Sequence, residues 1–145
     1  MSSLPSAGPG PTRLAWLSLW LPPITGMAGI FYLSSLSTVP GLGGMSDTWL
    51  HGAGYAGLSL TFVRAFARGE WRGVTRLAVF AAWLCATAYG ATDEWHQMYT
   101  PGRTAELRDV RNDAVGAALA LGVAWAWGRI TSARQPSRAG RAGPR

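Results

Sequence analysis

The sequence predicts an all-α fold, an integral membrane four-helix bundle with disordered N- and C-terminal tails. Its apolar residues are concentrated in four runs instead of amphipathic segments, and 48% of the 145 residues are hydrophobic. A hydrocarbon core of about 30 Å needs roughly 20 mostly apolar residues per helix. Four spans with short connections therefore nearly fill the chain, and we expect a single domain with no separate soluble part.

The four spans are predicted at 14–35, 48–67, 74–91 and 110–130. Pro22 and Pro23 lie inside the first span and should remove some of its backbone hydrogen bonds. Residues 1–13 and 132–145 are rich in Ser, Pro and Gly, a composition typical of disordered tails, which leaves 14–131 as the membrane domain. The small residues in 52–57 and 116–122 should let helices pack closely in lipid.

The net charge of +6 comes from arginine alone, and ten of the thirteen arginines fall on one side of the predicted spans. Because positive residues accumulate on the cytoplasmic side, we expect a multi-pass protein of the bacterial inner (cytoplasmic) membrane with both termini inside. The arginines flank hydrophobic runs, where they meet anionic lipid head groups, so we expect membrane lipids and no nucleic acid as partners. Cys85 is the single cysteine, which excludes an intramolecular disulfide.

Six of the seven acidic residues fall on the opposite side. There, Asp47, His51 and Tyr55 follow one another at intervals of four residues and share one helix face. An ionisable side chain at membrane depth is costly unless it faces protein or water, which makes His51 a functional candidate. The alternative is that His51 only hydrogen-bonds a neighbouring helix near the interface.

Further polar residues end the third span and begin the fourth. Asp93 and Glu94 precede Gln97 by four and three residues, so a helix would bring both carboxylates near the Gln97 amide. The Arg103 guanidinium is suited to hold a phosphate or a carboxylate. We expect a ligand-binding pocket built from Asp47, His51, Tyr55, Asp93, Glu94, Gln97, Arg103, Asp109 and Asp113.

Several kinds of chemistry could use such a set. A histidine beside a carboxylate can act as a base, so His51 and Glu94 are catalytic candidates, with Arg103 as a third candidate that holds an anion. A metal site is conceivable from four side chains, those of Asp47, His51, Glu94 and His96. Because the chain has no HExxH or comparable ligand pair, we expect no metal and no cofactor. A polar network that only holds the helices together is the remaining alternative.

Four blocks of sequence stand in a characteristic order. They are Phe31-Tyr32-Leu33-Ser34-Ser35, Asp47-x-x-x-His51-x-x-x-Tyr55, Gly90-x-x-Asp93-Glu94-x-His96-Gln97 with Pro101-Gly102-Arg103, and Asp109-x-x-x-Asp113-x-x-Gly116. Together they cover roughly residues 30–125, and the chain resembles the VanZ-like family of small bacterial membrane proteins. The chain departs from that family at Thr48, where relatives usually carry lysine.

The resemblance implies a role at the cell envelope, because the family takes its name from a member linked to low-level resistance to teicoplanin. Glycopeptides act on cell-wall precursors outside the cytoplasmic membrane, on the side where the polar residues are expected. We therefore expect the pocket to bind an anionic lipid or a lipid-linked cell-wall precursor. The alternatives are a membrane hydrolase or transferase acting on a lipid head group, and a non-catalytic helical partner of an envelope complex.

Overall fold

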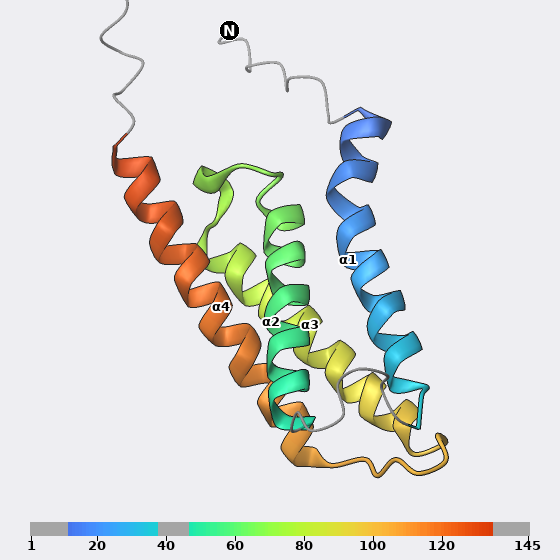
Figure 1. The fold of residues 1–145 in the computed structure, drawn as a ribbon. Helices are drawn as coiled ribbons and strands as arrows, with labels where there is room; N and C mark the ends of the chain where they lie inside the picture. Colours follow the sequence, from blue (N-terminus) through green and yellow to red (C-terminus); the bar gives the residue numbers. More distant parts are fainter. Residues whose placement is uncertain (1–11, 38–46, 135–145) are drawn as a thin grey trace, which may run out of the picture.

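The computed structural model describes residues 12–37 and 47–134, which form four α-helices, one short 3-10 turn and no strand. The elements are α1 (Arg13–Ser34), α2 (Asp47–Phe66), η1 (Trp71–Gly73), α3 (Arg76–Gln97) and α4 (Leu107–Ala133). In Figure 1 successive helices run in opposite directions, so the end of α3 and the start of α4 lie at the lower end. The predicted all-α four-helix bundle is confirmed.

The helix boundaries differ from the predicted spans mainly in α3. This helix begins at Arg76, because η1 occupies the segment before it, and it continues to Gln97 instead of ending near residue 91. The acidic pair Asp93 and Glu94 therefore lies within a regular helix. α4 continues to Ala133, which shortens the predicted C-terminal tail. The rest of the two predicted tails, 1–11 and 135–145, and the connector 38–46 lie outside the described residues.

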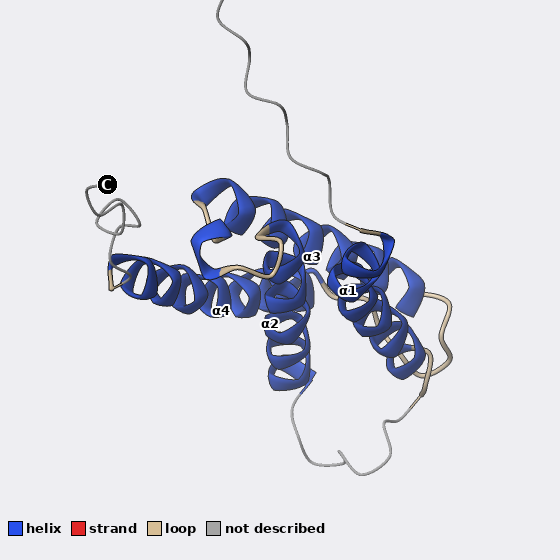
Figure 2. Ribbon diagram, turned by 90° about the horizontal axis from the view of Figure 1, so that it is seen from above, coloured by secondary structure: helices blue, strands red, loops and turns tan. Residues whose placement is uncertain are grey.

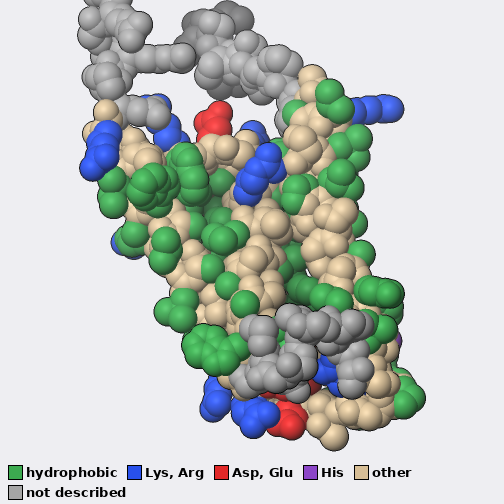
Figure 3. Space-filling view, in the orientation of Figure 1, with side chains coloured by type: hydrophobic (Ala, Val, Ile, Leu, Met, Phe, Trp, Pro, Cys, Tyr) green, Lys and Arg blue, Asp and Glu red, His purple; other side chains and the backbone are tan. Residues whose placement is uncertain are grey.

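Two of the helices, α1 and α4, are long and apolar enough to cross a bilayer. On the face seen in Figure 3, hydrophobic side chains spread over the middle of the molecule, while most charged side chains lie toward its two ends. That distribution is expected of helices whose middle lies in hydrocarbon and whose ends lie in water.

The core lies between α2, α3 and α4. α3 presents a small buried residue at every fourth position, namely Ala78, Ala82, Ala86 and Gly90. Small side chains allow neighbouring backbones to approach, and the Trp83 indole N–H reaches the Ala114 carbonyl oxygen of α4 at 3.0 Å. Figure 2 shows α1 and α4 on opposite sides of the central pair α2 and α3.

One helix contact leaves no room for a side chain. A Cβ added to Gly116 of α4 would lie 2.8 Å from the Gly52 carbonyl carbon of α2, so a larger residue would force these two helices apart. A Cβ on Gly54, Gly57 or Gly122 would meet nothing within 4 Å. The prediction that small residues bring helices together is thus confirmed at the contact between residues 52 and 116 and wrong at the other three glycines.

α1 is attached to the bundle partly through its main chain. Pro22 has no N–H, so the Ser18 carbonyl lacks its helical donor, and the Arg64 side chain of α2 supplies one instead. Three side chains donate to carbonyl oxygens of α1 or of the turn after it: Arg64 to Ser18 at 2.9 Å, Tyr89 to Met27 at 2.6 Å and Arg103 to Leu36 at 3.1 Å. Most α1 side chains face outward, and only Pro23 and Ser34 are buried.

Candidate functional site

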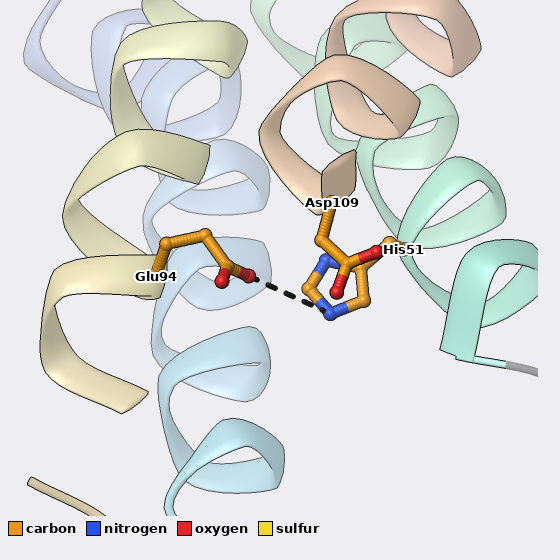
Figure 4. A group of neighbouring side chains, drawn as sticks. All are labelled: His51, Glu94 and Asp109. Carbon is orange, nitrogen blue, oxygen red and sulfur yellow. Dashed lines mark ion pairs between the residues drawn. The ribbon is translucent and has the colours of Figure 1, made fainter. Parts of the chain in front are cut away.

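The polar residues meet at the end of the bundle where α3 ends and α4 begins (Figure 1). His51 comes from the start of α2, Glu94 from the last turns of α3 and Asp109 from the first turn of α4. Figure 4 shows these three side chains directed toward one another. The His51 Nε2 atom lies 3.8 Å from Glu94 Oε1, and one ligand atom from each residue falls within 4.8 Å of the others.

A hydrogen bond at the second ring nitrogen, Nδ1, orients the His51 side chain. Nδ1 lies 3.1 Å from Asp113 Oδ1 of α4, and an ionised carboxylate only accepts, so we assign the ring proton to Nδ1. That assignment leaves the Nε2 lone pair facing Glu94. The ring is also nearly parallel to that of Tyr55, at 5° and 6.3 Å between centroids, as the spacing of the two residues on α2 predicts.

Asp113 can enter this site because the facing residue of α3 is a glycine. A Cβ on Gly90 would lie 2.6 Å from Asp113 Oδ2, so alanine there would displace the carboxylate. Asp113 is completely buried, and among the described residues its Oδ2 atom has no hydrogen-bond donor. Gly90 is part of the sequence block that suggested the family, but its spacing alone gives no hint of this contact.

Glu94 is fixed by two donors. The Glu106 backbone N–H, just before α4, donates to Glu94 Oε2 at 2.8 Å. The Gln97 amide donates to Glu94 Oε1 at 3.4 Å and to Asp93 Oδ2 at 3.3 Å, which confirms the pairing predicted from helical spacing. The Glu106 contact could not be foreseen, because it uses a backbone group that carries no sequence signal.

The carboxyl groups of this end are buried. Exposed fractions are 3% for Asp93, 5% for Glu94, 6% for Asp109 and 0% for Asp113. Asp109 accepts from the Asn112 amide at 3.2 Å and lies 3.8 Å from the half-exposed Arg108 side chain, which pairs more closely with Glu106. Carboxylates in such a place are stable only when donors or cations face them.

A groove of about 140 Å³ opens beside this cluster, between α1 and α2. Its apolar walls include Ile30, Leu33 and Leu50, and its polar lining comprises Ser34, His51, Tyr55, Asp93, Gln97 and Arg103. Five of the predicted pocket residues therefore line the groove, while Glu94, Asp109 and Asp113 are absent from its lining. Asp47 begins α2, but its side chain lies outside the described residues.

His96, one of four metal ligands considered from the sequence, does not join the cluster. Its Nε2 atom lies 3.0 Å from the Ser35 hydroxyl, and its ring stacks on Phe31 of α1 at 4.3 Å. The place expected for a second histidine is taken by Asp109. His96 instead helps to hold the end of α1 against α3.

The VanZ/LLP1 family model matches residues 25–128, a span that contains every residue of the cluster and the groove. No curated protein and no solved structure matches the chain. The family match and the two apolar helices identify a membrane protein. The four sequence blocks and the matching family model lead to the same conclusion: the chain belongs to the VanZ/LLP1 family.

Proposed function

We propose that this VanZ/LLP1 protein crosses the inner membrane four times and binds an anionic lipid, or a lipid-linked cell-wall precursor, in the groove between α1 and α2. The observation that carries the proposal is the composition of that groove. Its walls include the apolar side chains of Ile30, Leu33 and Leu50, and its lining also includes the Arg103 guanidinium. An acyl chain fits the first environment and a phosphate the second.

The charges at the two ends support an outward-facing groove. The end opposite the groove carries, among the described residues, Glu70 as an acid and Arg13, Arg64, Arg68, Arg72, Arg76, Arg129 and Arg134. Positive residues beside spans favour the cytoplasmic side. Both described ends of the chain, near Arg13 and Arg134, would then face the cytoplasm.

Orientation is tested with single cysteines in a Cys85→Ser background. Glu70, in the connection after α2, and Thr104, in the connection between α3 and α4, are exposed, so each can be replaced by cysteine without disturbing the core. A membrane-impermeant thiol reagent applied to intact cells should label the residue at 104 and spare the residue at 70. The reverse pattern would place the groove inside the cell and exclude envelope precursors as its ligands.

Lipid binding is tested by filling the groove. Gly54 lines it, and a Cβ there meets nothing within 4 Å, so Gly54→Leu should occupy the groove without a clash. Gly57→Leu is the matched control, because Gly57 lies on the same helix with equally open space and is absent from the groove lining. Native mass spectrometry of the purified chain with phosphatidylglycerol or undecaprenyl phosphate should show at least about tenfold weaker binding for Gly54→Leu only. Equal binding by both variants and the unmodified chain would exclude the groove.

The family name suggests an antibiotic readout for the same pair of variants. We expect cells that produce the unmodified chain to tolerate more teicoplanin than cells that produce Gly54→Leu, with Gly57→Leu behaving as the unmodified chain. Minimum inhibitory concentrations at matched membrane levels of protein measure this. Identical values for all three would separate this chain from glycopeptide susceptibility.

A second function is favoured by the arrangement at His51. A ring whose Nδ1 is held by Asp113 and whose Nε2 faces a carboxylate beside a groove has the geometry of a general base. Under this alternative the protein hydrolyses or transfers a lipid head group. His51→Gln should then abolish turnover of a bound lipid while leaving its binding intact, whereas a binding protein shows no turnover in either form.

A further inference from the structure

His51, Glu94 and Asp109 combine one imidazole nitrogen and two carboxylates, each from a different helix. The three residues are far apart in the sequence, so the cluster forms only because three helix ends meet. An imidazole with carboxylates is a donor set for divalent ions of the first transition row, such as Mn²⁺, Fe²⁺ and Zn²⁺. A metal–nitrogen or metal–oxygen bond is about 2.0–2.2 Å long, so two ligands of one ion lie at most about 4.4 Å apart. The His51 and Glu94 atoms are 3.8 Å apart and all three donor atoms lie within 4.8 Å of one another, so side-chain adjustments of a few tenths of an ångström bring them around one ion.

Each of the three side chains is oriented by a contact that leaves a donor atom facing the others. Asp113 holds His51 at Nδ1, the Glu106 N–H holds Glu94 at Oε2, and the Asn112 amide holds Asp109 at Oδ1. Metal-binding histidines commonly donate their second N–H to a carboxylate, which fixes the ring and raises its basicity.

The charge at the site also favours a bound cation. The carboxyl groups of Asp93, Glu94, Asp109 and Asp113 are at least nine-tenths buried. Arg103 lines the adjacent groove, and the half-exposed Arg108 lies 3.8 Å from Asp109 but pairs more closely with Glu106. Asp113 Oδ2 has no donor at all in this part of the chain. A bound dication would reduce the electrostatic cost of holding these carboxylates together.

We propose that His51 Nε2, Glu94 and Asp109 bind one divalent transition-metal ion. Asp113 acts as a positioning residue for His51. The sequence predicts no metal, because the chain has no HExxH or comparable ligand pair. In the structure Asp109 joins His51 and Glu94, whereas His96, a ligand considered from the sequence, contacts Ser35. The proposal deepens the proposed function, on which this part of it rests, by placing a cation directly behind His51, which lines the groove. Ion binding itself does not require a lipid.

The first experiment uses the unmodified full chain in detergent, stripped with a chelator and titrated with Mn²⁺. We expect about one Mn²⁺ per chain, with pulsed electron paramagnetic resonance showing coupling to one imidazole ¹⁴N. Zn²⁺ should displace the bound Mn²⁺. Binding weaker than about 1 mM, or bound Mn²⁺ without nitrogen coupling, would overturn the proposal.

The second experiment compares isosteric variants. Asp109→Asn should abolish stoichiometric binding, and its Oδ1 atom can still accept from Asn112, so the fold is preserved. Glu106→Gln is the matched control, since Glu106 contributes a backbone N–H to the site and its side chain pairs with Arg108. Asp113→Asn should weaken binding by about 10–100-fold and broaden the nitrogen signal, as expected for a residue that orients a ligand.

The lipid assay with Gly54→Leu separates this inference from the proposed function. If the chain binds lipid in the groove but binds no Mn²⁺, the ion site is overturned and the proposed lipid site is retained. If the chain binds one Mn²⁺ and Gly54→Leu does not weaken lipid binding, the ion site is retained and the groove is excluded as the lipid site.

Discussion

The two ends of the bundle carry opposite charges, and they treat those charges differently. At the groove end, Glu94, Asp109 and Asp113 are buried among helices that touch through glycine. At the arginine end, Arg72, Arg76 and Arg129 are exposed around an open cavity of about 660 Å³, and Arg76 lies 6.0 Å from the Trp125 ring centroid. Exposed charge is sufficient to orient a protein in a membrane, whereas buried charge requires close packing and paired donors.

If this contrast is correct, the largest effect should follow from Gly116→Ala. The added Cβ would press on the Gly52 backbone, and we expect a loss of about 3 kcal/mol in the free energy of unfolding, with low accumulation in the membrane. Gly122→Ala on the same helix meets nothing within 4 Å and serves as the control. Unfolding in mixed detergent micelles measures both. Similar stabilities would contradict the close helix contact.

A smaller effect is expected where Gly90 faces Asp113. Gly90→Ala should destabilise the chain by about 2 kcal/mol, because its Cβ would meet the Asp113 carboxylate. Asp113→Ala removes the partner of His51 and should cost about 2 kcal/mol as well. The double variant should cost less than the sum, with a coupling of about 1 kcal/mol in the same unfolding assay. Additive effects would mean that the two residues do not touch.

The attachment of α1 should be weaker still. Tyr89→Phe removes the hydrogen bond to the Met27 carbonyl oxygen and should cost about 1 kcal/mol. Faster hydrogen exchange in α1 than in α4 would be the signature, because α1 is bound to the bundle by few buried side chains. Uniformly faster exchange in all four helices would show that α1 is not a separable part.

The smallest change is expected at the arginine end. Arg76→Gln removes the contact with the Trp125 ring and should alter stability by only about 0.5 kcal/mol. The same unfolding assay, with Arg68→Gln as an exposed control, measures it. A cost as large as that of Asp113→Ala would erase the contrast between the two ends.

Helical spacing predicts the local part of the site. It places Gln97 beside Asp93 and Glu94, and it aligns His51 with Tyr55, because both relations lie within one helix. On a helical wheel of α3, His96 lies roughly 100° from the mean direction of Asp93, Glu94 and Gln97. Helical spacing could therefore have predicted that His96 points away from the cluster.

The remainder depends on which helices are neighbours. Asp109 reaches His51 only because α2 and α4 are in contact, and no pattern within either segment encodes that. The role of the Glu106 N–H is equally hidden, since every residue except proline has one. Glycine spacing is an ambiguous signal, because Gly116 lies at a close helix contact whereas a Cβ on Gly122 would meet nothing within 4 Å.

The bonds that fasten α1 give this helix an unusual freedom. Arg64, Tyr89 and Arg103 all grip carbonyl oxygens, which every amino acid supplies. These three hydrogen bonds are therefore independent of the identity of the α1 side chains, although Trp20 and Met27 also pack against the core and Phe31 stacks on His96. Leu33, an exposed residue that lines the groove, can be exchanged for another apolar residue without loss of these hydrogen bonds. The outward face of α1 can thus change its chemistry while these three hydrogen bonds stay the same.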